Sequence, residues 1–234
     1  MKKSAFLLLS VFLFSAVFFF TSCDKPPIIG GNIIEAKDVT SFSPENLEKI
    51  DKVKAFIFYF DEYELKEIAS CKFEKNGFTL TLPEDVPEKY LYGFGDTEST
   101  GIKVNPANAK LAPIQIIACD KSGNNIGYFF FSSENYFNAT EYPTYGTSFW
   151  YLDRRVTIKG KHIDEFSTKY DCSLKKGWNI LYSKLEQDGF TVSSSKPSGV
   201  NFKWCFMGGY LLASKKDSCP LITHEQILSM MPSF

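Results

Sequence analysis

Apolar and polar residues alternate along much of the chain beyond residue 50, and this period of two predicts β-strands. The run Val53–Phe60 is almost continuously apolar and rich in branched and aromatic residues, which is typical of a strand covered on both faces. Two further runs, at 68–73 and 77–82, flank Asn76-Gly77. Because both of these residues tolerate positive φ, the dipeptide predicts a tight hairpin turn.

The same pattern continues through the second half of the chain. A hairpin is predicted around the polar residues 120–125. Residues 149–159 alternate like a single strand, with Arg154 interrupting the apolar face. Shorter runs at 168–174, 178–185, 189–193 and 200–206 extend the pattern into a meander of about five strands.

These elements predict a mainly β fold. We expect an antiparallel β-sandwich over residues 47–132 and a second β region over residues 133–234. The polar, aromatic and turn-rich stretch 132–148 suggests the boundary, and whether the two parts form one domain or two stays open. Thr223 followed by Gln226 fits a capping box, so a short C-terminal helix is expected.

The first 22 residues have the composition of a secretory signal peptide. Lys2 and Lys3 form a positive start, and residues 5–20 are apolar except for two serines. Small residues then lead to Cys23. Residues 23–46, with Pro26-Pro27 and Gly30-Gly31, are predicted to form a tether between this leader and the folded part.

The segment Phe20-Thr21-Ser22-Cys23 resembles the lipobox of bacterial lipoproteins, and the phenylalanine-rich leader is similar to those of Bacteroidetes lipoproteins. The resemblance implies cleavage before Cys23 and attachment of diacylglycerol, with palmitate among the acyl chains, to its thiol. The chain departs from the pattern at Phe20, where leucine is commonest. Two alternatives stay open: the apolar run is retained as a membrane span, or cleavage is ordinary and leaves Cys23 a free thiol.

A second resemblance covers residues 53–94. The order of a strand, an Asn-Gly turn, Thr79-Leu80-Thr81-Leu82-Pro83 and Tyr90-Leu91 is similar to transthyretin-like and immunoglobulin-like β-sandwich modules of such lipoproteins. This resemblance implies a sandwich in the first half of the mature chain.

Charge limits the classes of partner. Removal of the leader reduces the 26 basic residues to 24, against 27 acidic ones, so the mature chain has a formal charge of −3. Nucleic-acid binding requires a basic surface. Because the mature chain has no excess of basic over acidic residues, no nucleic-acid partner is expected. The expected partners are the membrane, through the N-terminal lipid, and a glycan or another envelope protein.

Five cysteines remain once Cys23 is assigned to lipid. Cys71, Cys119 and Cys172 alternate in phase with apolar neighbours and are expected to be buried. Cys205 and Cys219 flank a short excursion, and a disulfide between them would contribute about 3 kcal/mol. Without it, both are ordinary thiols.

The sequence offers no complete catalytic set, and we predict neither a catalytic residue nor a cofactor. The chain has two histidines, His162 and His224, and both are expected on the surface. No Cys-x-x-Cys or complete calcium loop occurs, so no metal site is expected; Asp120 is assigned to a hairpin turn. Carboxylates are numerous, which keeps a glycoside hydrolase as an alternative.

Aromatic residues are the most suggestive feature for binding. Tyr142, Tyr145, Trp150 and Tyr151 crowd a polar, turn-rich stretch, and sugars stack on aromatic faces. The competing interpretation is that these rings fill the core, as we expect for Trp178 and Trp204.

The sequence therefore predicts a non-enzymatic, lipid-anchored protein of the cell envelope, at the outer membrane, with a binding or assembly role. One alternative is an accessory glycan-binding lipoprotein of an outer-membrane carbohydrate uptake system. The other is a glycoside hydrolase-type enzyme.

Overall fold

The computed structural model describes residues 28–29, 31–41, 44–59, 64–95, 97, 99–133, 136, 142–163 and 167–208. The leader, Cys23, Cys219 and the predicted C-terminal helix lie outside these residues. The described part confirms the mainly β prediction, since it contains sixteen strands and its longest helix is a six-residue 3-10 helix.

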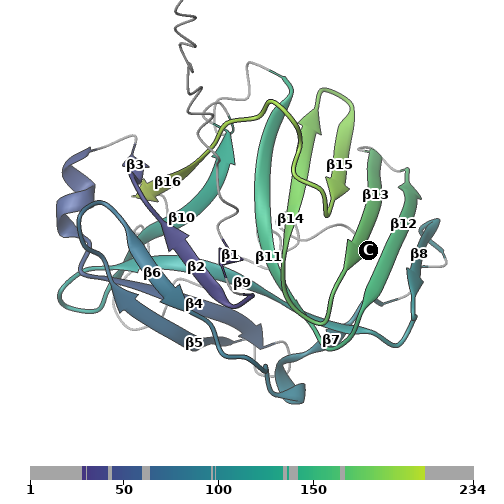
Figure 1. Cartoon of the computed structure of the whole chain (residues 1–234), viewed down its shortest axis with the longest axis horizontal. Coiled ribbons are helices and arrows are strands. Elements are labelled where there is room, and N and C mark those ends of the chain that lie inside the picture. The colour runs from purple at the N-terminus through teal and green to yellow at the C-terminus, as the bar shows by residue number, and fades with distance from the viewer. Residues whose placement is uncertain are drawn as a thin grey trace, which may run out of the picture.

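The strands follow one another with short connections (Figure 1). In chain order the elements are β1 (Ile28–Ile29), β2 (Ile33–Ala36), β3 (Thr40–Ser41), η1 (Pro44–Lys49), β4 (Lys52–Tyr59), β5 (Glu64–Lys72), β6 (Phe78–Thr81), η2 (Glu88–Tyr90), β7 (Tyr92–Gly93), β8 (Ile102–Asn105), β9 (Lys110–Cys119), β10 (Asn125–Ser133), β11 (Thr144–Leu152), β12 (Val156–His162), β13 (Ser167–Leu174), β14 (Gly177–Glu186), β15 (Gly189–Ser193) and β16 (Phe202–Gly208).

These strands form two sheets. The small sheet has the order β1-β2-β6 and is antiparallel. The large sheet has 13 strands, with the path β3-β16-β10-β9-β11-β14-β15-β13-β12-β8 and with β4, β5 and β7 attached beside it. Two of its pairings, β13 with β15 and β16 with β3, are parallel, so the large sheet is mixed rather than purely antiparallel.

Strand β9 joins the two halves of the chain. Its residues 114–119 pair with β4, and its residues 111–114 pair with β11. The large sheet therefore runs through the boundary predicted at residue 132, and the two predicted regions share one sheet. In Figure 1, β4, β5 and β6 lie at one end of the molecule, whereas β8, β12 and β13 lie at the other.

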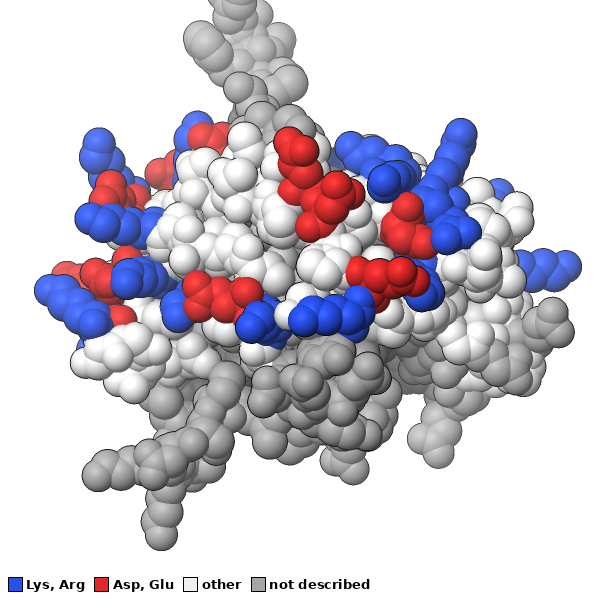
Figure 2. Space-filling model, turned by 90° about the horizontal axis from the view of Figure 1, so that it is seen from below, with Lys and Arg blue, Asp and Glu red and all other residues white. Residues whose placement is uncertain are grey.

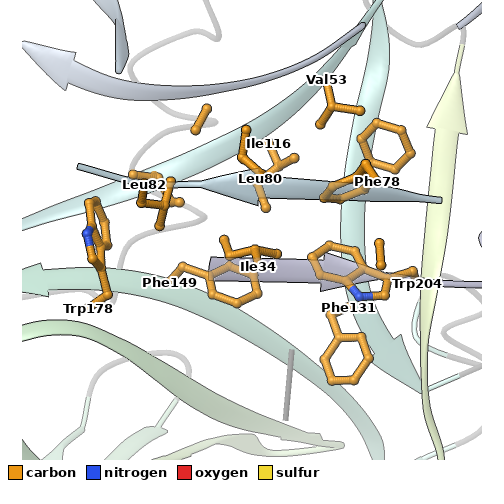
Figure 3. Packing of buried hydrophobic residues seen from close by; sticks show 14 of the residues in the cluster. Ile34, Val53, Phe78, Leu80, Leu82, Ile116, Phe131, Phe149, Trp178 and Trp204 are labelled. Carbon is orange, nitrogen blue, oxygen red and sulfur yellow. The ribbon is translucent and has the colours of Figure 1, made fainter. Parts of the chain in front are cut away.

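The main core lies between the small sheet and the large one (Figure 3). Ile34 and Leu80, from the paired strands β2 and β6, are completely buried in it. Trp204 contacts Phe78 with ring centroids 5.2 Å apart and stacks on Phe149 at 5.9 Å. Burial of Ile34, Ala36 and Val39 corrects the predicted tether: strand β2 and its neighbours belong to the folded body, because these apolar side chains complete this core.

A second core lies on the other face of β11. Trp150 and Leu152 point into it, whereas Phe149 and Tyr151 point into the main core. Val156 and Ile158 share this second core with Trp150. The single strand predicted over residues 149–159 is therefore wrong: the chain turns at Asp153 and Arg154, and the apolar period survives because β11 and β12 feed the same cluster.

Only the turn of the first predicted hairpin forms, shifted by one residue, because its two strands pair elsewhere: β5 pairs with β4 in the large sheet, and β6 pairs with β2 in the small one. Lys75 and Asn76, rather than Asn76 and Gly77, have positive φ, and Glu74 bridges Gly77. Gly77 is needed for another reason: a Cβ there would lie 2.4 Å from the backbone oxygen of Ala36. The second hairpin turns at Asp120, whose Oδ1 accepts hydrogen bonds from the backbone N–H groups of Ser122 and Asn124.

Candidate functional site

An open depression of about 750 Å³ lies over strands β12, β13 and β15 and the turn before β15. We call it the charged depression, since six of its lining residues carry a formal charge: Lys159, Lys161, Lys169, Asp171, Glu186 and Asp188. Ser167 and Thr191 add hydroxyl groups. Its volume falls in the range of small-molecule binding sites.

Strand alternation places these side chains. On β13, Thr168, Tyr170, Cys172 and Leu174 are buried, and the residues between them face outward. The outward set includes Ser167, Lys169 and Asp171. Because β12 pairs with β13 in register, Lys161 lies opposite Lys169, and Lys159 lies opposite Asp171. The polar phase of two adjacent strands therefore forms the floor and one wall of the depression.

The depression extends into a row of residues that are register partners on adjacent strands of the large sheet. Thr191 is the register partner of Lys169 on one side and of Lys184 on the other. Lys184 in turn pairs with Tyr145 on β11. We call this set, Lys161, Lys169, Thr191, Lys184 and Tyr145, the lysine row. It crosses five adjacent strands and carries three ammonium groups on one face.

The acids of the site are unevenly shared among these lysines. Lys159 lies 3.6 Å from Asp171, and both side chains are mostly exposed. Glu186 binds Lys184, and this hydrogen bond raises the pKa of the Lys184 ammonium group. Among the residues that the structure describes, neither Lys161 nor Lys169 makes an ion pair. Two like charges thus face each other across β12 and β13, an arrangement that weakens a sheet.

Gly189 allows β15 to approach β13 at the rim of the depression. A Cβ at this position would lie 2.2 Å from the backbone oxygen of Ser167 and 2.5 Å from its Oγ. Ser167 also donates a hydrogen bond of 3.3 Å to the backbone oxygen of Asp188. The parallel pairing of β13 with β15, which brings Thr191 beside Lys169, therefore depends on a residue without a side chain.

The four aromatic residues predicted as a binding surface do not come together. Trp150 is 3% exposed and Tyr151 is 2% exposed, and they point into different cores. The burial of these two rings corrects their assignment to a ligand surface, because adjacent residues of a strand covered on both faces cannot reach solvent. Tyr151 instead donates a hydrogen bond of 3.0 Å to Asp85 Oδ1.

The other two predicted residues remain at the surface. Tyr142 is 45% exposed and precedes β11. Tyr145 is half-buried, packs edge-on against Phe202 at 6.4 Å, and ends the lysine row. Of the predicted set, Tyr145 alone belongs to the row that enters the charged depression. Lysines 159, 161 and 169 are the sequence signal for this site. The predicted binding set, which contained aromatic residues only, did not include them.

The described cysteines, Cys71, Cys119, Cys172 and Cys205, are free thiols. Cys119 and Cys172 are buried, as expected, and Cys71 is half-buried. Desolvation raises the pKa of Cys71 to about 11 and that of Cys172 to about 12. Cys205 is buried with Sγ 3.6 Å from Thr40 Oγ1, and its predicted partner Cys219 lies outside the described residues.

Both histidines of the chain were expected on the surface. His162 Nδ1 lies 3.2 Å from the backbone oxygen of Thr100, on the half-buried side of β12, rather than fully on the surface. His224 lies outside the described residues. Within the described ranges, no three His, Cys, Asp or Glu side chains gather in a way that would hold a metal ion.

Comparison with known proteins gave no match: no family model, no curated protein and no solved structure matches this chain. No helix in the described part of the chain has the length and hydropathy needed to span a bilayer.

Proposed function

We propose that this chain is a lipid-anchored bacterial envelope protein whose β-sheet body binds a partner at the charged depression. The anchor is supported by the sequence around Cys23, because a charged start, an apolar run and a small-residue exit precede the cysteine. The two acyl chains of a diacylglycerol on one cysteine would hold the chain stably, since each buried methylene contributes about 0.8 kcal/mol.

The observation that carries the binding role is the charged depression itself. Its volume of about 750 Å³ suits a ligand of several rings, and it offers amines, carboxylates and hydroxyls within a single surface. It lies on a continuous sheet, whose paired strands hold these groups at fixed spacing. A rigid surface loses little conformational freedom when a ligand binds.

This assignment moves the proposed binding site away from the aromatic residues of the turn-rich stretch. Glycan binding remains one form of the proposal, with Tyr145 as the aromatic side chain at the end of the lysine row. Trp150 and Tyr151 have no part in it, because both are buried.

The arrangement of carboxylates favours binding over glycoside hydrolysis. A glycosidase needs one carboxylic acid that stays protonated near neutral pH. Asp171 and Glu186 are instead each held in an ion pair with a lysine. Both acids are therefore suited to hold lysines in place or to accept hydrogen bonds from a ligand.

The anchor is tested by mass spectrometry of the mature N-terminus, with Cys23→Ala as the control. We expect the wild-type chain to begin at Cys23, to carry acyl mass and to fractionate with the membrane, and the variant to lose the acyl mass. An unmodified Cys23 thiol in a chain recovered from the aqueous fraction would contradict the anchor.

The binding role is tested separately, by placing a photo-crosslinking amino acid at Thr191 inside the charged depression and, in a second variant, at Thr79 on β6. Both positions are on strands and outside the cores. We expect a crosslinked partner at position 191 that is missing at position 79. Equal crosslinking at both positions would contradict a specific site.

A further inference from the structure

We propose that Lys161 and Lys169 receive the anionic group of an acidic glycan, such as a uronic acid or a sulfated sugar. The inference rests on the proposed binding role of the charged depression, and it names the class of ligand. The register of β12 and β13 makes Lys161 and Lys169 direct partners, and both residues are on the outward face of the sheet.

The carboxylates of the site do not pair with all of its lysines. Seven charged residues line the depression or continue its row, and two of the carboxylates are already paired: Asp171 with Lys159 and Glu186 with Lys184. In the described part of the chain, Lys161 and Lys169 have no such partner within ion-pair distance. An anion placed between them would relieve their repulsion and accept hydrogen bonds from both.

Hydroxyl groups and carboxylates line the same depression as these two lysines. Ser167 and Thr191 bring hydroxyl groups to the same surface, and Thr191 is the register partner of Lys169. Glu186 and Asp188 also line the depression with carboxylates. A ligand that fills the site therefore needs both a negative group and hydrogen-bond donors, such as sugar hydroxyls.

The carboxylates in the depression disfavour a uniformly negative partner. An anionic bilayer or a nucleic acid would press negative charge against Glu186 and Asp188 as well as against the lysines. On the face shown in Figure 2, basic and acidic side chains are interspersed and form no field of one sign, so this face does not favour such a partner either. A glycan with separated anionic groups matches this distribution of charge.

The test is a two-dimensional NMR titration of the full 15N-labelled chain at low ionic strength. The probes are trigalacturonate, a chondroitin sulfate tetrasaccharide and, as a neutral match to the first, the galactose trisaccharide of the same linkage. We expect at least one acidic probe to shift the amide signals of Lys169 and Thr191, with an affinity at least tenfold above that of the neutral trisaccharide. The affinity should fall as salt is added.

Lys161→Ala/Lys169→Ala is the test variant, and Lys66→Ala/Lys72→Ala on β5 is its control. The control removes the same charge from two exposed lysines that make no ion pair in the described part of the chain. We expect the test variant, with an unchanged circular dichroism spectrum, to lose about tenfold in affinity for each lysine and the control to lose little.

Three results would overturn the inference. Equal affinity for the acidic and neutral trisaccharides would do so while leaving a binding role for the depression intact. Full binding by Lys161→Ala/Lys169→Ala would move the anion elsewhere. Shifts at the same amides with anionic phospholipid vesicles, and with neither acidic oligosaccharide, would assign the lysines to a membrane surface instead.

Discussion

Trp178 Nε1 donates a hydrogen bond of 2.8 Å to the backbone oxygen of Pro83, although 95 positions separate the two residues. Trp178 lies on β14 and is almost fully buried, whereas Pro83 lies in the connection between β6 and η2. Tyr151 reaches the same connection through its hydrogen bond to Asp85. These two bonds attach the segment that follows the small sheet to the large sheet, and so close one end of the main core.

Replacement of Trp178 by Phe tests this attachment. The variant keeps an aromatic ring but leaves the Pro83 carbonyl without its donor, so we expect the free energy of unfolding to fall by about 1–3 kcal/mol. Urea denaturation followed by circular dichroism measures the change. Tyr142→Phe, at an exposed ring, is the control and should stay within about 0.5 kcal/mol of wild type. An unchanged midpoint for Trp178→Phe would show that the bond contributes nothing.

Asp153 gives the fold a dependence on acid. Burial opposes ionisation of its carboxyl, but hydrogen bonds from Arg154 and from the Lys110 backbone N–H, the latter 2.8 Å long, outweigh burial and hold its pKa below the usual value. A carboxyl whose pKa is lower in the folded state than in the unfolded state stabilises the fold above the unfolded pKa of about 3.9, and this contribution is lost as pH falls.

We therefore expect Asp153→Asn to be less stable than wild type by about 0.2–1 kcal/mol near pH 7, and the difference to shrink as the pH is lowered below about 4. Urea denaturation at a series of pH values gives both quantities. A difference that stays constant down to acid pH would mean that the charge of Asp153 has no role.

The sequence predicted most of the strands because alternation reports burial directly. On β13 the predicted phase of Thr168, Tyr170, Cys172 and Leu174 matches the buried set residue by residue. The alternation pattern was misleading where the same apolar phase continues on both sides of a turn. Trp150 and Ile158 lie on different strands but in the same core, so periodicity alone could not reveal the reversal at Asp153.

The site was less accessible to sequence reasoning than the fold. Whether Trp150 faces solvent depends on what covers the second face of β11, and that cover comes from β12 and β13, which are later in the chain. The opposition of Lys161 and Lys169 depends likewise on the register of a hairpin. A shift by two residues would have placed Lys161 opposite Ser167 or Asp171 and kept every apolar side chain on the buried face, so alternation alone does not fix the register.

Cys71 should be a poor nucleophile in the folded chain. Desolvation raises its pKa to about 11, against about 8.5 for an exposed thiol, so its thiolate fraction near pH 8 is at least about a hundredfold smaller. We expect iodoacetamide to label Cys71 slowly in native buffer and rapidly in urea, as followed by mass spectrometry of its peptide. Equal rates in the two conditions would place the thiol at the surface.

Gly189→Ala tests the close approach of β15 to β13. The added methyl group would meet the backbone oxygen of Ser167, which cannot move away without separating the paired strands. We expect a loss of about 1–3 kcal/mol in the free energy of unfolding. Gly93→Ala on β7 is the matched control, because its Cβ would meet nothing within 4 Å, and a similar loss in both variants would refute the contact.

Lys169→Glu separates the stability of the lysine pair from its proposed use. If the like charges of Lys161 and Lys169 are held opposite each other for binding, the fold tolerates a repulsion that an opposite charge would remove. The variant should then gain about 0.2–1 kcal/mol in the free energy of unfolding, since an opposite-charge pair replaces a like-charge pair across two strands. Because salt screens exposed charges, the gain measured by urea denaturation should shrink as sodium chloride is raised. Lys66→Glu on β5 supplies the control for net charge, and it has no lysine opposite it, since its register partner is Ile57. A loss of stability in Lys169→Glu, or an equal gain in Lys66→Glu, would show that the two ammonium groups do not repel each other in the folded chain.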